Sequence, residues 1–212
     1  SGSAWSAGAV AVLAQLLGVH HPESVVGIHI TDLGFARAFA QLRDPSEAEQ
    51  RYLAEMQMSS MQEGAYAMIQ GTKPQTLACG LNDSPVGLAA WLIEKRRTWG
   101  DCRGNLESRF SKDDLLNTVM LYWLTQSFGT SARYYYEAMH NLWHPSHKCV
   151  PVVEAPTGMA VFVNEVVLMP RKWAERYYNL QRWTVMLSGG HFGAMEEPER
   201  LIEDLRAFFR SL

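Results

Sequence analysis

The sequence predicts an α/β fold that is interrupted by a helical insertion. Short apolar runs that suit buried strands occur near both ends of the 212-residue chain, next to segments that suit helices. The middle of the chain instead carries a series of helix start signals. Charged types make up only 19% of the residues, below the roughly 25% usual for soluble domains. Either much of the chain is buried, or part of its surface faces a partner.

The first two elements form the start of an α/β unit. We expect a buried helix over Ser6–Leu17, packed through small residues, and a short buried strand over Ser24–Ile30. Residues 1–20 contain no aspartate, glutamate, lysine or arginine, but they lack the basic start of a signal peptide and the apolar length of a membrane span. The three cysteines lack C-x-x-C spacing and fit free thiols in a reducing compartment. These features predict a cytoplasmic protein with no membrane span.

The helical insertion extends over about residues 33–147 and separates an N-terminal part, 1–32, from a C-terminal part, 148–212. Its first helix has an N-cap aspartate, a proline at the first position and a glutamate at the third. Ser84-Pro85 and the pair Ser111 and Asp114 are similar start signals. The four expected helices start at Asp44, Ser84, Ser111 and Ser131 and extend to about Met61, Trp99, Trp123 and Met139.

The C-terminal part returns to alternating strands and helices. Its expected elements are a strand over Met159–Val163, a helix over Arg171–Tyr178, a strand over Trp183–Leu187 and a helix over Pro198–Leu212. Glu165 follows the first of these strands and His191 follows the second. Active residues of open α/β sheets lie just beyond the carboxyl ends of strands. Both residues are therefore candidates for a site.

His191 is the candidate general base. Gly189 and Gly190 allow a sharp turn before it, and Glu165 is the carboxylate that could orient its ring. The alternative is that His191 is an ordinary loop histidine and Glu165 a solvated loop glutamate.

A nucleophile is expected in a strand-to-helix turn with small residues on both sides, and the N-terminus offers two frames. Gly2-Ser3-Ala4-Trp5-Ser6 places Ala4 at the centre, and alanine cannot attack a substrate. The shifted frame Ala4–Gly8 places Ser6 there, which with Glu165 and His191 would make a serine hydrolase. The alternative is a Gly/Ser-rich terminus without a chemical role.

Several longer motifs follow one another in a fixed order: Ala65–Met68, Lys73–Thr76, Asp83–Trp91, Leu121–Thr125, Arg133–Glu137, Pro170–Trp173 and Gly189–Phe192. With these motifs the sequence resembles the α/β-hydrolase-fold epoxide hydrolases of the microsomal type, and His21-Pro22-Glu23 extends the match almost to residue 1. The resemblance implies the C-terminal portion of an α/β-hydrolase fold with an all-helical cap (lid) insertion. The N-terminal strands of that sheet are absent from this chain.

The resemblance also implies roles for particular residues. In the family an aspartate attacks the epoxide and forms an alkyl-enzyme ester, while two cap tyrosines hydrogen-bond the epoxide oxygen. A histidine oriented by a carboxylate then activates water to hydrolyse the ester. Carried over by motif, the tyrosines are Tyr66 and Tyr135, the base is His191 and the orienting acid is Glu165. Tyr134 and Tyr136 are one position away from Tyr135.

The chain departs from the family at two points. The family has Gly-x-Asp-Trp-Gly where this chain has Ala4 at the nucleophile position, with the backbone N–H of Trp5 as an oxyanion donor. An epoxide hydrolase with this alanine is expected to be inactive or impaired. The family's His-Gly-x-Pro loop is also missing, so a second chain or fragment could supply the other half of the sheet, and a homo-oligomer is a further possibility.

The expected ligand is a small apolar epoxide, either an aromatic hydrocarbon or a natural-product type. The remaining alternative is a non-catalytic subunit, such as one half of a split hydrolase, that binds such ligands without turnover. A net charge of −3 argues against a nucleic-acid partner. No metal-ligand spacing, phosphate loop or dinucleotide fingerprint is present in the sequence, so no cofactor is expected.

Overall fold

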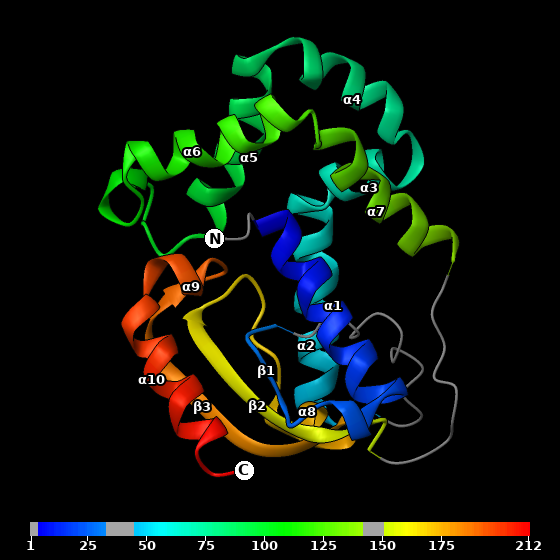
Figure 1. Cartoon of the computed structure of the whole chain (residues 1–212), viewed down its shortest axis with the longest axis vertical. Helices are drawn as coiled ribbons and strands as arrows, with labels where there is room; N and C mark the ends of the chain where they lie inside the picture. Colours follow the sequence, from blue (N-terminus) through cyan, green and yellow to red (C-terminus); the bar gives the residue numbers. More distant parts are fainter. Residues whose placement is uncertain (1–3, 33–44, 142–150) are drawn as a thin grey trace.

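The computed structural model describes the backbone of residues 4–32, 45–141 and 151–212, and the side chains of these ranges apart from residues 4–11. The described residues form a small parallel sheet with flanking helices and, above it, a stack of further helices (Figure 1). We call the helices over residues 65–140 the helical layer. The predicted α/β fold with a helical insertion is confirmed.

The sheet of the described residues has three parallel strands in the order β1 (Ile28–Ile30), β2 (Val153–Asn164) and β3 (Tyr178–Gly190). The strand predicted over Ser24–Ile30 is too long, because Pro22–Ser24 forms a 3₁₀ turn before it. The other two strands are longer than predicted. Because all strands are parallel, their carboxyl ends point the same way, towards the helical layer (Figure 1).

Helices cover both faces of the sheet. Those of the sheet layer are α1 (Ala4–His20), α8 (Arg171–Tyr177), α9 (Gly193–Glu196) and α10 (Pro198–Phe209). Ile28 and Ile30 of β1 belong to the buried cluster that includes Val19 of α1. His29, between them, points to the other face and contacts Phe208 of α10. The two helices therefore lie on opposite faces of the sheet, as Figure 1 shows.

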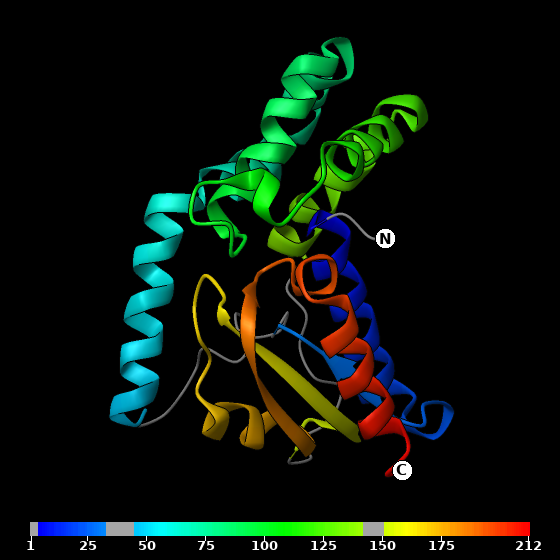
Figure 2. The same ribbon diagram turned by 90° about the vertical axis from the view of Figure 1, so that its left-hand side faces the viewer.

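A long helix connects the sheet layer with the helical layer. It is α2 (Glu47–Glu63), which stands beside the sheet and leads up to the other helices (Figure 2). Ser46 caps it, in a capping box in which the Ser46 N–H donates to the Glu49 carboxylate at 2.8 Å. The predicted cap, Asp44, lies outside the described residues. The helix cap therefore lies two positions later than the sequence predicts.

The helices of the helical layer are α3 (Ala65–Thr72), α4 (Pro74–Asp83), α5 (Pro85–Trp99), α6 (Lys112–Thr125) and α7 (Phe128–His140), with a 3₁₀ turn over Leu106–Ser108. Ser84 and Ser111 cap α5 and α6 as predicted. Leu88, Leu92 and Phe128 are almost fully buried among them. Burying one such side chain contributes roughly 1.5–3 kcal/mol, so this layer has a core of its own.

Some of the expected features lie outside the described ranges. The boundaries predicted near residues 33 and 147 fall there, as does Cys149, so the three-part division of the chain stays a prediction. Helices α3, α4 and α9 were not predicted. None of the helices in the described part of the chain has the length and apolarity that a membrane crossing requires.

Candidate active site

The ends of β2 and β3 bring Glu165 and His191 together. Asn164 of β2 pairs with Gly190 of β3, so the residues that follow these two leave the sheet side by side. His191 Nδ1 lies 2.8 Å from Oε1 of Glu165. A carboxylate can only accept, so Nδ1 carries the proton and donates it to Glu165. The two side chains are 23% and 13% exposed, which leaves the ring accessible at its edge.

Glu165 changes the proton affinity of His191. Burial lowers the pKa of the imidazole, but the charge of Glu165 and its hydrogen bond outweigh burial and raise this pKa to about 9. Asp32 and Glu196 contribute in the same direction. The ring is therefore mostly protonated at neutral pH, and its capacity to act as a base increases as the pH approaches 9.

Aromatic rings from the end of α5 and from the start of α9 border the imidazole. The Trp99 ring lies edge-on at 5.2 Å between centroids and the Phe192 ring at 5.3 Å. The backbone N–H of His191 also donates to the Trp99 carbonyl at 3.0 Å. The helical layer therefore contacts His191 both through its backbone and through its ring.

Trp99 connects His191 with the predicted tyrosine pair. The Tyr66 ring of α3 lies 5.4 Å from the Trp99 ring and 5.7 Å from the Tyr135 ring of α7, measured between centroids. The rings of His191, Trp99, Tyr66 and Tyr135 thus form one continuous row from the edge of the sheet into the helical layer. Lys95 is close to this row, with Nζ 5.6 Å from the centre of the Tyr66 ring.

The structure separates Tyr135 from its two neighbours in the tyrosine run. Tyr135 packs edge-on against Tyr66. Tyr136 is exposed and stacks on His140 at 4.0 Å, one turn further along α7. Tyr134 packs edge-on against Tyr135. The ring contact with Tyr66 described above comes from Tyr135, the residue that the family motif selects.

The predicted nucleophile position can be placed only in part. Helix α1 begins at Ala4, and its N-terminal end points towards the helical layer (Figure 1). The side chains of Ala4, Trp5 and Ser6 lie outside the described residues, so the distance of each from His191 stays open. A cavity of about 420 Å³ opens beside the site, between Asp101, Arg109 and Ser188, and does not include His191 or the two tyrosines in its lining.

The described residues hold no group of three or more His, Cys, Asp or Glu side chains that could bind a metal ion. Charged side chains close to the row of rings form ion pairs and hydrogen bonds with neighbouring side chains. Lys95 Nζ lies 2.9 Å from Glu63, whose Oε2 also accepts from the Trp99 indole at 3.2 Å.

Comparisons with known proteins agree with the family resemblance, although no protein-family model matches the chain. Epoxide hydrolase 1 of Sus scrofa is 44% identical over 156 residues, covering 70% of this chain and 34% of that protein. The juvenile hormone epoxide hydrolase of Bombyx mori is 32% identical over 215 residues, covering 92% of this chain and 47% of that protein. The crystal structure of juvenile hormone epoxide hydrolase from the silkworm superposes with a TM-score of 0.78 at 30% identity, over 95% of this chain and 53% of that one.

The chain belongs to the epoxide hydrolase family. It spans between a third and a half of the length of the curated relatives it matches, and it has the fold of the C-terminal portion of these α/β-hydrolases. The activity of the whole protein is therefore a matter for proposal.

Two residues beside the site of this epoxide hydrolase homologue are not among the predicted site residues. Trp99 is predicted only as the end of a helix, and Lys95 lies within that predicted helix. Both contact the row of rings through tertiary packing. Their only sequence signal is that residues 95 and 99 share one face of a helix.

Proposed function

We propose that this chain carries the base and the cap residues of an epoxide hydrolase and binds a small apolar epoxide. The observation that carries this proposal is the hydrogen-bonded pair of His191 and Glu165 at the start of a row of rings that ends in Tyr66 and Tyr135. We also propose that residues 33–147 are the cap, so that the two phenols come from the cap and the imidazole from the sheet.

The phenols of Tyr66 and Tyr135 would act in ring opening. A carboxylate oxygen at position 4 would bond to one epoxide carbon while the bond between that carbon and the epoxide oxygen breaks. The oxygen then develops negative charge, which the two hydroxyl groups stabilise by hydrogen bonds before one of them donates a proton. In the row of rings these hydroxyls belong to residues from two helices, α3 and α7.

His191 would act in the second step. Its neutral ring removes a proton from water, and the oxygen of that water attacks the carbonyl carbon of the ester. The diol leaves, the carboxylate is restored, and the proton that His191 took from water returns to the tyrosine that was deprotonated in the first step. Glu165 keeps the Nδ1 proton in place and stabilises the imidazolium that forms.

Ala4 makes the first step impossible at that position, because a methyl group has no lone pair to form the ester. We therefore propose that the chain as it stands binds epoxides with little or no turnover. This alanine favours binding of an epoxide over its turnover. The alternative function, a serine hydrolase that uses Ser6, would be recognised by acylation of the chain with an esterase probe.

The decisive experiment restores the carboxylate with Ala4→Asp. The variant is incubated with an aryl epoxide, alone and after co-expression with the complementary half of the Bombyx mori relative. The reaction is followed by intact-protein mass and diol formation. We expect Ala4→Asp to form diol, and the double variant with His191→Gln to accumulate the mass of one epoxide as an ester. The parent chain should do neither.

If the folded Ala4→Asp variant forms neither ester nor diol, alone or together with the complementary half, the proposed function is contradicted. The matched control is Ser6→Asp, which places a carboxylate two positions further along the same helix. It should give no ester if position 4 is the nucleophile position.

A further inference from the structure

A buried carboxylate that has no role in the proposed reaction holds the loop of His191. Glu196 ends α9 and is 8% exposed. Its Oε2 accepts from the backbone N–H of Gly190 at 3.1 Å, and its Oε1 accepts from that of Phe192 at 3.0 Å. The two amides that flank His191 in the chain are thus bound to a single side chain.

The same carboxylate reaches across to the helical layer. Oε2 of Glu196 also accepts from the backbone N–H of Asp101 at 2.7 Å, just beyond the end of α5. The N–H of His191 donates in the opposite direction, to the carbonyl of Trp99. Three consecutive amides around the imidazole are therefore hydrogen-bonded, two of them to Glu196 and one to Trp99.

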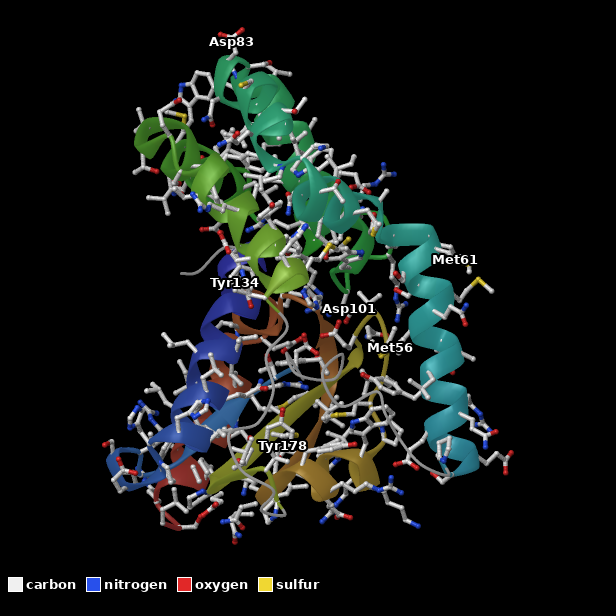
Figure 3. The ribbon with its side chains drawn as sticks, turned by 90° about the vertical axis from the view of Figure 1, so that its right-hand side faces the viewer. Met56, Met61, Asp83, Asp101, Tyr134 and Tyr178 are labelled. Atoms are coloured by element: carbon white, nitrogen blue, oxygen red, sulfur yellow. The ribbon has the colours of Figure 1, made fainter. Side chains whose placement is uncertain are left out.

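A second set of contacts supports this junction. Arg109 donates to the Asp101 carboxylate and to Glu197, both at 3.0 Å, and Asp101 accepts from the N–H of Gly189 at 3.1 Å. A Cβ on Gly190 would lie 2.6 Å from the Trp99 carbonyl oxygen, so the two segments are in close contact. Figure 3 shows Asp101 between the helical layer and the sheet.

We propose that Glu196 is a positioning residue, which fixes the His191 loop to the end of α5 and so sets the alignment of the imidazole with Glu165 and with Trp99. The proposal rests on the proposed function only in that it takes His191 as the base. A carboxylate suits this role because its two oxygens can accept from three N–H groups, whereas an amide side chain offers one accepting oxygen.

The test compares Glu196→Asp with Glu196→Gln. Aspartate keeps the negative charge but is one methylene shorter, so it cannot reach both segments. Glutamine keeps the length but loses the charge and one acceptor. The charged groups facing His191 include Glu165, Asp32 and Glu196, so loss of charge alone would lower the pKa of His191 in the glutamine variant. The aspartate variant keeps the charge, so a change in the His191 pKa in that variant reports the loss of positioning.

The readout is the proton NMR spectrum of the whole chain. Positioning predicts that both variants lower the pKa of His191 by about one unit or more and weaken the low-field Nδ1–H signal of the bond to Glu165. The signals of His29, in the core of the sheet layer, report that the fold is intact. Exposed Glu199→Gln, which removes the same charge nearby, is the control and should change neither signal.

A folded Glu196→Asp variant with the parent's His191 pKa and Nδ1–H signal would overturn the proposal. If that variant does not fold, hydrogen exchange of Glu196→Gln decides. We expect the amides of Gly190, Phe192 and Asp101 to exchange at least tenfold faster while the strand interiors stay protected, and parent-like exchange at these three amides would overturn the proposal. No step involves an epoxide, so failure of Ala4→Asp to react would count against the proposed function and leave this result standing.

Discussion

The His191–Glu165 and His29–Asp204 pairs of the sheet layer have the same short distance between nitrogen and oxygen. His191 Nδ1 lies 2.8 Å from Glu165, and His29 Nε2 lies 2.8 Å from Asp204. The first pair is 23% and 13% exposed, whereas the second is 2% and 3% exposed. The bond length therefore does not identify the reactive histidine, and the surroundings of each pair have to be compared.

The His29 pair belongs to a closed network. Asp204 Oδ1 accepts from Arg182 Nε at 2.7 Å and from Thr184 Oγ1 at 2.6 Å, while Oδ2 faces His29. These contacts join β1, β3 and α10, and Phe208 packs against the His29 ring. Both oxygens of the Asp204 carboxylate accept hydrogen bonds within the core, which is typical of a structural role.

The His191 pair is open on one side. Glu165 receives the imidazole bond and the N–H of its neighbour Val166, and the rest of the ring faces the aromatic row and the edge of the sheet. The difference between the pairs is that the His191 ring is bound through Nδ1 and remains more exposed than the His29 ring, which is what a general base requires.

The largest effect should come from Asp204→Ala. Removing one partner of a buried ionic network leaves Arg182 and His29 without their acceptor and should lower the free energy of unfolding by about 3–5 kcal/mol. Glu165→Ala, at the more open pair, removes one hydrogen bond to a charged ring and should cost less, about 1.5–3 kcal/mol. Urea unfolding followed by circular dichroism measures both, and equal losses would remove the distinction between the pairs.

The second effect is chemical and uses the Ala4→Asp background. His191→Gln should slow hydrolysis of the alkyl-enzyme ester by about 10²–10⁴-fold, because the water loses its general base. The matched variant His29→Gln should lower stability but leave the rate of ester hydrolysis in the folded fraction within about threefold of its parent. Single-turnover mass spectrometry gives these rates, and a similar loss in both variants would contradict the assignment.

The third effect is a difference in the pH dependence of stability. Burial raises the pKa of Asp204, but hydrogen bonds from Thr184, His29 and Arg182 outweigh it and lower this pKa below its ordinary value. Its stabilisation is therefore present above the unfolded pKa of about 3.9 and is lost as the pH falls through the lower folded value. Asp204→Asn should flatten the acid limb of the stability curve.

The His191 pair has the opposite sign. The folded pKa of His191 is raised to about 9, so its stabilisation is fully present below the unfolded pKa of about 6.5 and is lost as the pH rises through 9. Glu165→Gln should flatten this alkaline limb. Denaturant midpoints measured from pH 3 to pH 10 check both limbs, and an unchanged alkaline limb would show that Glu165 does not stabilise the imidazolium.

The smallest effect should come from Thr184→Val, which removes one of the hydrogen bonds to Asp204 and keeps the side-chain volume. A hydrogen bond to a charged group contributes about 1.5–3 kcal/mol, and the remaining partners should keep the loss near the lower value. Thr184→Ser retains the hydroxyl group and should lose less. The same urea titration distinguishes them, and an equal loss would assign the effect to packing.

Local signals in the sequence were sufficient for the helix starts at Ser84 and Ser111 and for the placement of Glu165 and His191 beyond buried strands. Each of these features depends on residues only a few positions apart, so the local sequence is enough to predict it. The His29–Asp204 pair spans 175 positions, and no spacing rule connects its members.

The sequence by itself thus determined the fold class and the family resemblance, and it singled out His191 and Glu165 as candidates. Only the tertiary structure decided that Tyr135 rather than Tyr136 faces Tyr66, that Trp99 joins the tyrosines to His191, and that Glu196 holds the loop between them. The physical reason is that these contacts arise between elements that are distant in the chain and that meet only when the helical layer packs onto the edge of the sheet.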